Sequence, residues 1–226
     1  MKPTTILERA LNYSSYSKGA EYSASDITAE PLMVKLRKKY PKLDDIKTID
    51  KVKAFIGTGF HLNCSEWITK ENEFNDTGIR TEHKVKYRNL SGTADIIFPD
   101  GTIGDWKTGS ETNITKKIKE PKDWITQMSI YSYLLYKQEN IPMQPKGYIY
   151  WVTTDTGKYG TLELKLLTKE ETINIIKEFM TEMKKPIEET KQCKLCTQFL
   201  YRWCSARSKC PMFGEDKNFD DKIESW

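Results

Sequence analysis

The pattern of hydrophobic and polar positions along this chain predicts helices packed on a sheet. Apolar residues recur at three- and four-residue steps where helices are expected, and apolar and polar residues alternate where strands are expected. In chain order, the expected elements are a short helix within 23–40, a helix at 44–70, a strand at 80–90, two strands flanking a turn at 99–101, a helix at about 122–138, strands within 147–154 and 160–168, and a helix that follows a capping box of Thr168 and Glu171. This order predicts an α/β (α+β) fold in which helices flank a mixed central sheet.

The helix expected at 44–70 carries one apolar stripe at helical spacing. Its members are Val52, Phe55, Ile56, Phe60, Cys64 and Trp67. A free cysteine on such a stripe usually packs as a small hydrophobic residue, so we expect Cys64 to do the same.

Composition and charge limit the class of protein. The 226 residues suit one domain with an appendage, and 38% hydrophobic with 30% charged residues suits a soluble chain. No run of eighteen apolar residues exists, so no membrane partner is expected. Residues 1–26 lack the apolar segment of a signal peptide, which predicts a cytoplasmic location, or the host cytoplasm for a viral protein. The net charge of +4 permits a nucleic-acid partner without arguing for one.

Two aspartates lie in the most strand-like segment, GTADIIFPDGTIGDWKTGS. Residues 99–101 (Pro-Asp-Gly) are typical of a three-residue hairpin loop with a left-handed glycine. That loop places Asp95 opposite Asp105, with Cβ atoms about 5 Å apart and Lys107 on the same face. Like charges so placed are destabilising unless a cation lies between them, and Mg²⁺ is typically held by one or two carboxylates. The alternative is a solvated edge hairpin.

Three motifs resemble those of the PD-(D/E)XK nucleases, in their RecB-like branch. GTADII…GDWK resembles the GxxD…(D/E)xK core, QMSIYSYLL resembles the QxxxY element, and GTGFH resembles the histidine element that precedes the sheet. The motifs occur in the family's order within residues 50 to 155. The resemblance implies a restriction-endonuclease-like core and a divalent-metal-dependent DNA nuclease.

The resemblance also implies a role for each matched residue. Mg²⁺ or Mn²⁺ would be held by His61, Asp95, Asp105 and the backbone carbonyl of Trp106. Lys107 would orient or activate the attacking water, Glu82 would be an accessory acid, and Gln127 and Tyr131 would touch DNA or hold Lys107. Each of three residues has an alternative interpretation: His61 as a helix-surface histidine, Tyr131 as a core residue, and Glu82 as one of several charges on an alternating strand.

A cysteine cluster near the end of the chain predicts a second, structural metal centre. It has the spacing C-x2-C-x7-C-x5-C and consists of Cys193, Cys196, Cys204 and Cys210. Four thiolates suit Zn²⁺ or a [4Fe–4S] cluster. The iron–sulfur nucleases of this branch place their first cysteine ahead of the histidine element, where this chain reads SASDITAEP. Both metals stay open, and the compact spacing favours zinc.

These observations predict three parts: an N-terminal helical or irregular segment (1–45), a nuclease core (46–190), and a cysteine segment with an acidic tail (191–226). The predicted function is an exonuclease or single-strand-preferring DNA nuclease of a virus or mobile element, acting in recombination, repair or processing. Its partners would be DNA and a helicase, recombinase or single-strand-binding protein. One alternative is a catalytically silent DNA-binding subunit of such a complex, and another is a sequence-specific restriction endonuclease.

Overall fold

The structure is a computed structural model that describes residues 20–40, 48–190 and 210. Contacts within the chain group it into two compact units. The first comprises residues 1–28 and 48–175, and the second comprises residues 29–47 and 176–226. The division at 45 and 190 into three parts stays a prediction.

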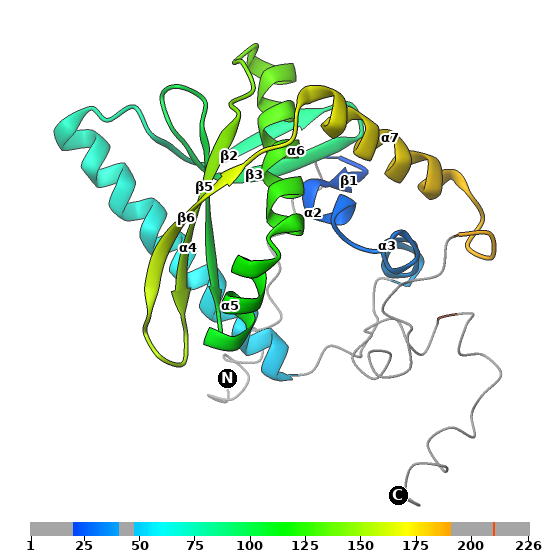
Figure 1. The fold of residues 1–226 in the computed structure, drawn as a ribbon, viewed down its shortest axis with the longest axis horizontal. Coiled ribbons are helices and arrows are strands. Elements are labelled where there is room, and N and C mark those ends of the chain that lie inside the picture. The colour runs from blue at the N-terminus through cyan, green and yellow to red at the C-terminus, as the bar shows by residue number, and fades with distance from the viewer. Residues whose placement is uncertain (1–19, 41–47, 191–209, 211–226) are drawn as a thin grey trace, which may run out of the picture. The chain divides into compact units, whose positions relative to one another are not determined.

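The first unit is built around a six-stranded mixed sheet in the order β1-β3-β4-β5-β6, with β2 also paired to β3 (Figure 1). Its strands are β1 (Tyr22–Ser23), β2 (Arg80–Tyr87), β3 (Leu90–Ile97), β4 (Ile103–Gly109), β5 (Lys146–Thr153) and β6 (Tyr159–Lys165). Its helices are α2 (Ala24–Ile27), α4 (Thr48–Asn75), α5 (Glu111–Lys119), α6 (Lys122–Glu139) and the first turns of α7 (Lys169–Lys184). This mixed α/β architecture confirms the predicted fold class and is consistent with a restriction-endonuclease-like fold.

The hairpin of β3 and β4 has the register that its turn predicted. The paired residues are Ile97 with Ile103 and Ile96 with Gly104. Gly101 closes the loop with a φ of 86°, in the left-handed region that a glycine adopts without strain. The Pro-Asp-Gly sequence therefore determines how these two strands meet.

β3 and β4 separate directly after the second of these pairs. β4 continues in parallel with β5 from Ile103 to Gly109, whereas β3 continues antiparallel to β2. The next residue on each strand beyond the last pair is an aspartate, Asp95 on β3 and Asp105 on β4. We call this point of separation the fork.

Helices α4 and α6 lie on opposite sides of the sheet (Figure 1). The Phe60 ring of α4 meets the Trp106 ring edge-on, with centroids 5.8 Å apart. The ammonium of Lys107 donates to the Gln127 side chain of α6 at 3.2 Å. Because successive strand residues point to opposite faces, Trp106 faces α4 and Lys107 faces α6. The fork therefore lies between the two helices.

Only part of the apolar stripe of α4 faces the sheet: Phe60 and Cys64 are partly buried, whereas other members are exposed. Phe55 is 52% exposed and Trp67 is 61% exposed, whereas Ile68, which was outside the stripe, is only 5% exposed. Small polar residues of the neighbouring face contact the sheet, as in the 2.7 Å hydrogen bond from Ser65 to Thr81. Periodicity identified an apolar face correctly, but the face that contacts the sheet overlaps it only in part and extends to Ser65 and Ile68.

Two further differences concern helices. The expected helix within 23–40 is two helices, α2 and α3 (Pro31–Lys39), and Pro31 occupies the first turn of the second. Helix α5 was not predicted, because Ile114 is its single buried residue. The predicted capping box of α7 is confirmed by reciprocal hydrogen bonds between Thr168 and Glu171 of 2.8 and 3.2 Å.

The second unit contains α3, the remainder of α7 and residues 185–190. Leu32 and Leu36 of α3 form a small buried cluster with Cys210. The buried side chain of Lys35 donates to the Lys185 carbonyl oxygen and to the Thr190 hydroxyl. Helix α3 therefore contacts the residues just before and just after segment 191–209. Within the described ranges, no helix is long and apolar enough to cross a membrane.

Candidate active site

The two aspartates of the fork are buried, with 8% of Asp95 and 2% of Asp105 exposed. The backbone N–H of Trp106 donates to Asp95 Oδ2 at 2.8 Å. In a continued hairpin this N–H would have met the backbone of β3, so the carboxylate replaces the missing strand partner. The fork therefore fixes the Asp95 carboxylate against the strand that carries Asp105.

Asp105 is held mainly by the charge of Lys107. The Lys107 ammonium lies 2.5 Å from Asp105 Oδ2 as an ion pair, yet this buried oxygen has no partner in hydrogen-bond geometry. Burial raises the pKa of Asp105 to about 6, the charge of Lys107 opposes this shift, and the charge of Asp95 adds to it. A second cation at Asp105 would relieve the cost of keeping the carboxylate ionised.

Gln127 and Tyr131 of α6 support Lys107. Lys107 Nζ donates to Gln127 Oε1 at 3.2 Å, and Gln127 Nε2 donates to the Tyr131 hydroxyl at 3.0 Å. Burial of Tyr131, followed by the charges of Asp105 and Asp95, raises the pKa of its hydroxyl above the ordinary value. The hydroxyl is therefore neutral, and it holds the amide with its oxygen turned toward the lysine.

His61 approaches the fork from α4, on the other side of the sheet. Its Nδ1 atom lies 3.3 Å from Asp95 Oδ2. Burial opposes the charged imidazole, but the hydrogen bond to Asp95 and the charges of Asp95 and Asp105 outweigh it and raise the pKa of His61. The histidine is therefore directed at the acids and is not an ordinary helix-surface residue.

Glu82 reaches the same point from β2 through an unusual backbone. The register of β2 on β3 pairs Thr81 with Ile96 and His83 with Ala94, which places Glu82 opposite Asp95. Its φ of 47° lies in the left-handed region, where a residue other than glycine is strained. One Glu82 oxygen is buried without a hydrogen-bond partner.

Glu82 differs in burial from Lys84 and Lys86, the neighbouring lysines of β2. Both lysines are exposed, whereas Glu82 Oε1 is buried. Burial, followed by the charge of Asp95, raises the pKa of Glu82.

Ligand atoms of His61, Glu82 and Asp95 all lie within 4.8 Å of one another, a spacing at which one metal ion can be held. Asp105 and Lys107 adjoin this group on β4, and Gln127 and Tyr131 adjoin it on α6. The structure thus brings together the predicted side chains from α4, β2, β3, β4 and α6. Their catalytic roles, and that of the Trp106 carbonyl, stay predictions.

Comparison with known proteins gives similar folds at low sequence identity. The crystal structure of SSO0001 matches with a TM-score of 0.62 and 18% identity, over 94% of this chain and 97% of that one. An alkaline exonuclease from Laribacter hongkongensis has a TM-score of 0.42 and 12% identity, over 74% of this chain and 89% of that one. A phage-related exonuclease from Haemophilus somnus 129PT has a TM-score of 0.34 and 12% identity, over 79% of this chain and 77% of that one.

No family model matches this chain, and no curated protein matches it. The similarity to SSO0001 shows the fold. The function therefore has to follow from the site itself.

Gly92 supports the site but was not among the predicted site residues. A Cβ atom added at Gly92 would lie 2.5 Å from Cε1 of Tyr131, closer than real Cβ contacts. The absence of a side chain on β3 thus leaves room for the ring whose hydroxyl holds Gln127. The motif GTADII contains this glycine, but only the packing of α6 on β3 shows what it does.

The predicted structural metal centre falls largely outside the described residues. The structure does not describe three of its four cysteines, Cys193, Cys196 and Cys204, so the centre stays a prediction. Cys210 is described and buried, and it packs against Leu32 and Leu36. Cys64 is partly buried on α4, and burial raises the pKa of its thiol. Both described cysteines are free thiols.

Proposed function

We propose that this chain is a divalent-metal-dependent DNA nuclease that hydrolyses phosphodiester bonds. The observation that carries the proposal is the fork, where two buried carboxylates and a lysine meet at the separation of β3 and β4. A fold gains nothing in stability from this crowding of like charges, since Asp105 is nearly inaccessible and its ionised form is disfavoured. Such groups are typical of sites kept for chemistry.

The donor atoms fit a hard divalent cation. Two of the buried polar atoms without a hydrogen-bond partner among the described residues are carboxylate oxygens, Glu82 Oε1 and Asp105 Oδ2. Mg²⁺ and Mn²⁺ prefer oxygen ligands, and imidazole is accepted by transition metals such as Mn²⁺. The ion would be held by His61, Asp95, Asp105 and the Trp106 carbonyl, with Glu82 as accessory acid. When bound, it would polarise the phosphate and lower the pKa of a coordinated water.

The chain's own residues would position the reacting groups. Lys107 places a positive charge beside Asp105, where it can hold the attacking water and stabilise the anionic transition state. Gln127 accepts from Lys107 and keeps its ammonium within the site. The neutral hydroxyl of Tyr131 fixes the orientation of the Gln127 amide.

We propose DNA as the substrate, with cleavage governed by strand form or by free ends. In this proposal the protein acts as an exonuclease or a single-strand-preferring nuclease in recombination, repair or processing, in a virus or mobile element. A helicase, a recombinase or a single-strand-binding protein would be its partner.

The test is digestion of end-labelled DNA, single- and double-stranded, linear and circular, with Mg²⁺ or Mn²⁺. Asp105→Asn should lower the cleavage rate by about 10³-fold or more, because it removes a charged oxygen of the site. Asp123→Asn is the matched control, since Asp123 is an exposed aspartate of α6 paired with Lys117, and it should cleave within about twofold of wild type. DNA binding without cleavage by the wild type would instead identify a catalytically silent subunit.

We also propose a structural metal at Cys193, Cys196, Cys204 and Cys210, either Zn²⁺ or a [4Fe–4S] cluster. Four thiolates close together in sequence are the observation that supports it. Elemental analysis of anaerobically purified protein distinguishes zinc in a colourless sample from iron in a brown one. Four freely reactive thiols with neither metal would refute the centre, and Cys64→Ser should retain it.

A further inference from the structure

A row of alternating cations and tyrosine rings lies at the C-terminal end of α6. The row consists of Arg88, Tyr87, Lys137, Tyr136 and Lys169, and we call it the cation–tyrosine row. Arg88 lies 5.2 Å from the centre of the Tyr87 ring, Lys137 lies 5.4 Å from the centres of both the Tyr87 and the Tyr136 rings, and Lys169 lies 4.5 Å from that of Tyr136. Three separate segments therefore contribute to one continuous strip of the first unit.

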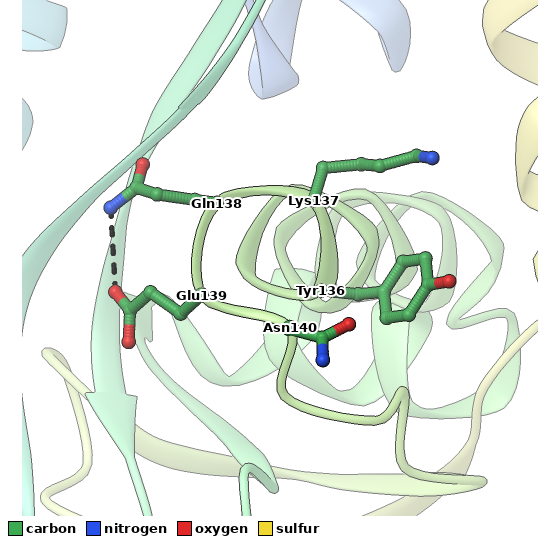
Figure 2. Close-up of a pocket in the computed structure, with 5 residues that line it drawn as sticks. All are labelled: Tyr136, Lys137, Gln138, Glu139 and Asn140. Carbon is green, nitrogen blue, oxygen red and sulfur yellow. Dashed lines mark hydrogen bonds between the residues drawn. The ribbon is translucent and has the colours of Figure 1, made fainter.

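The three cations of the row have no carboxylate partner among the described residues. Glu139 is the acid next to them on α6, but it is engaged by Arg80 and His83 at 2.6 Å each. Figure 2 shows Gln138 and Glu139 on one side of the helix end and Tyr136 and Lys137 on the other. The row therefore carries an uncompensated charge of about three.

This arrangement differs from an ordinary lysine packed over a ring. Lys146 also lies over a tyrosine, 5.4 Å from the centre of the Tyr148 ring, but it is paired with Glu163 at 3.2 Å. In the row, a hydrogen bond from Lys169, with the charges of Lys169 and Lys137, lowers the pKa of Tyr136. Cations that share rings repel one another, and a bound anion would relieve that repulsion.

We infer that the cation–tyrosine row binds a strand of nucleic acid, with phosphates against its three cations and bases against its two tyrosines. Single-stranded nucleic acid is recognised by basic grooves combined with aromatic side chains on which bases stack. The planar guanidinium of Arg88 can donate two parallel hydrogen bonds to a phosphate. An acidic peptide offers charge but no succession of rings, so it fits the row less well.

The row lies apart from the fork along α6. Ten residues separate Gln127 from Lys137, which is about 15 Å along a helix axis. The inference rests on the proposed function for the identity of the strand, which would be the DNA substrate. The row would then give the nuclease a second contact with its substrate beyond the cleaved phosphate.

The experiment measures binding of a labelled 20-nucleotide oligo(dT) by fluorescence anisotropy, in Mg²⁺ and over a series of salt concentrations. All proteins carry Asp105→Asn so that cleavage does not interfere. Arg88→Gln/Lys137→Gln/Lys169→Gln should weaken binding by about tenfold or more and make the plot of log K against log salt shallower by about 2, since each phosphate contact on a single strand contributes about 0.7. Lys146→Gln is the matched control and should leave both quantities unchanged.

A second variant tests the rings independently of the charges. Tyr87→Leu/Tyr136→Leu should weaken oligo(dT) binding about tenfold while leaving the salt dependence unchanged, because stacking carries no counterion release. Unchanged affinity and salt slope in both variants would overturn the row as a nucleic-acid site. A labelled poly-glutamate peptide that binds as tightly as oligo(dT), and is lost in the triple variant, would replace nucleic acid by an acidic protein partner.

Failure of the row and failure of the proposed function have different signatures. If the chain cleaves DNA, and the triple variant without Asp105→Asn binds and cleaves like wild type, the row is refuted and the nuclease stands. If no metal supports cleavage but the triple variant loses oligo(dT) binding, the nuclease is refuted and the row stands.

Discussion

The two units of the chain each bury a charged side chain, and they do so in opposite ways. In the first unit, Asp105 lies beside Lys107 but also beside a second acid, and one of its buried oxygens has no hydrogen-bond partner. In the second unit, Lys35 donates to the Lys185 carbonyl and the Thr190 hydroxyl, both of them neutral oxygens. One charge is left partly unsatisfied, and the other is satisfied by neutral hydrogen-bond acceptors.

The difference suits Asp105 to a role in chemistry and Lys35 to a role in structure. An unsatisfied buried acid destabilises the folded state and is available to a ligand. A buried lysine with hydrogen-bond acceptors joins the segments that supply those acceptors. Removing the first charge should therefore stabilise the metal-free protein, and removing the second should destabilise it.

The largest expected effect is on the pH dependence of folding. The folded pKa of Asp105 is raised to about 6, above the unfolded value of about 3.9. The folded state therefore binds the proton more readily, and the metal-free protein loses stability as pH rises through 6. Between pH 4.5 and pH 7.5, wild type in chelator should lose about 2 kcal/mol more stability than Asp105→Asn, which is the part that Asp105 contributes.

Urea denaturation of both proteins at the two pH values measures this difference. The raised pKa of His61 acts in the same direction, since its stabilisation is also lost as pH rises, and it persists in the variant. Identical pH profiles for wild type and Asp105→Asn would contradict the assignment of Asp105 as an unsatisfied charge. Mg²⁺ or Mn²⁺ at pH 7.5 should stabilise wild type more than the variant.

A smaller effect on stability is expected at Gly92, which leaves room for the ring of Tyr131. Gly92→Ala would drive a methyl group into the Tyr131 ring, and overpacking of this kind costs about 1.5 kcal/mol. Thermal unfolding measures it, with Gly59→Ala as control, because nothing lies within 4 Å of a Cβ at Gly59. The control should be neutral or stabilising, since alanine favours a helix. Equal melting temperatures for Gly92→Ala and wild type would show that the ring is not confined by β3.

The smallest effect is expected in the second unit. Lys35→Met removes two hydrogen bonds and relieves a buried charge, which leaves a net loss of about 1 kcal/mol. Burial lowers the folded pKa of Lys35, so the unit should gain stability as pH rises toward 10, opposite in sign to Asp105. Hydrogen exchange of amides in 31–39 and 185–190 reports this, with the exposed Lys39→Met as control. Slower exchange in Lys35→Met than in wild type would show that the buried lysine destabilises the second unit rather than stabilising it.

Local sequence chemistry predicted the part of the site that lies within one hairpin. The Pro-Asp-Gly turn determines the register of β3 on β4, so it also places Asp95 and Asp105 at equivalent positions. Beyond Gly104 the two strands separate, and β4 continues in the sheet beside β5, which is some forty residues later in the chain. No sequence pattern around Asp95 and Asp105 predicts where the two strands separate.

Long-range packing also explains the features that sequence patterns described wrongly. The apolar stripe of α4 was read as one face, but the sheet contacts only part of it, together with the neighbouring face that contains Ile68. The packing of Tyr131 on Gly92 joins two elements whose contact no local motif encodes.

The left-handed backbone of Glu82 has a consequence for how this sequence would change under selection. A residue with a Cβ atom in that conformation costs about 1 kcal/mol or more relative to glycine, and the buried oxygen of Glu82 adds to the cost. A library selected for heat resistance alone should therefore enrich glycine or asparagine at position 82. A library selected for cleavage should retain the acid. The residue found at position 82 would therefore distinguish selection for stability from selection for activity.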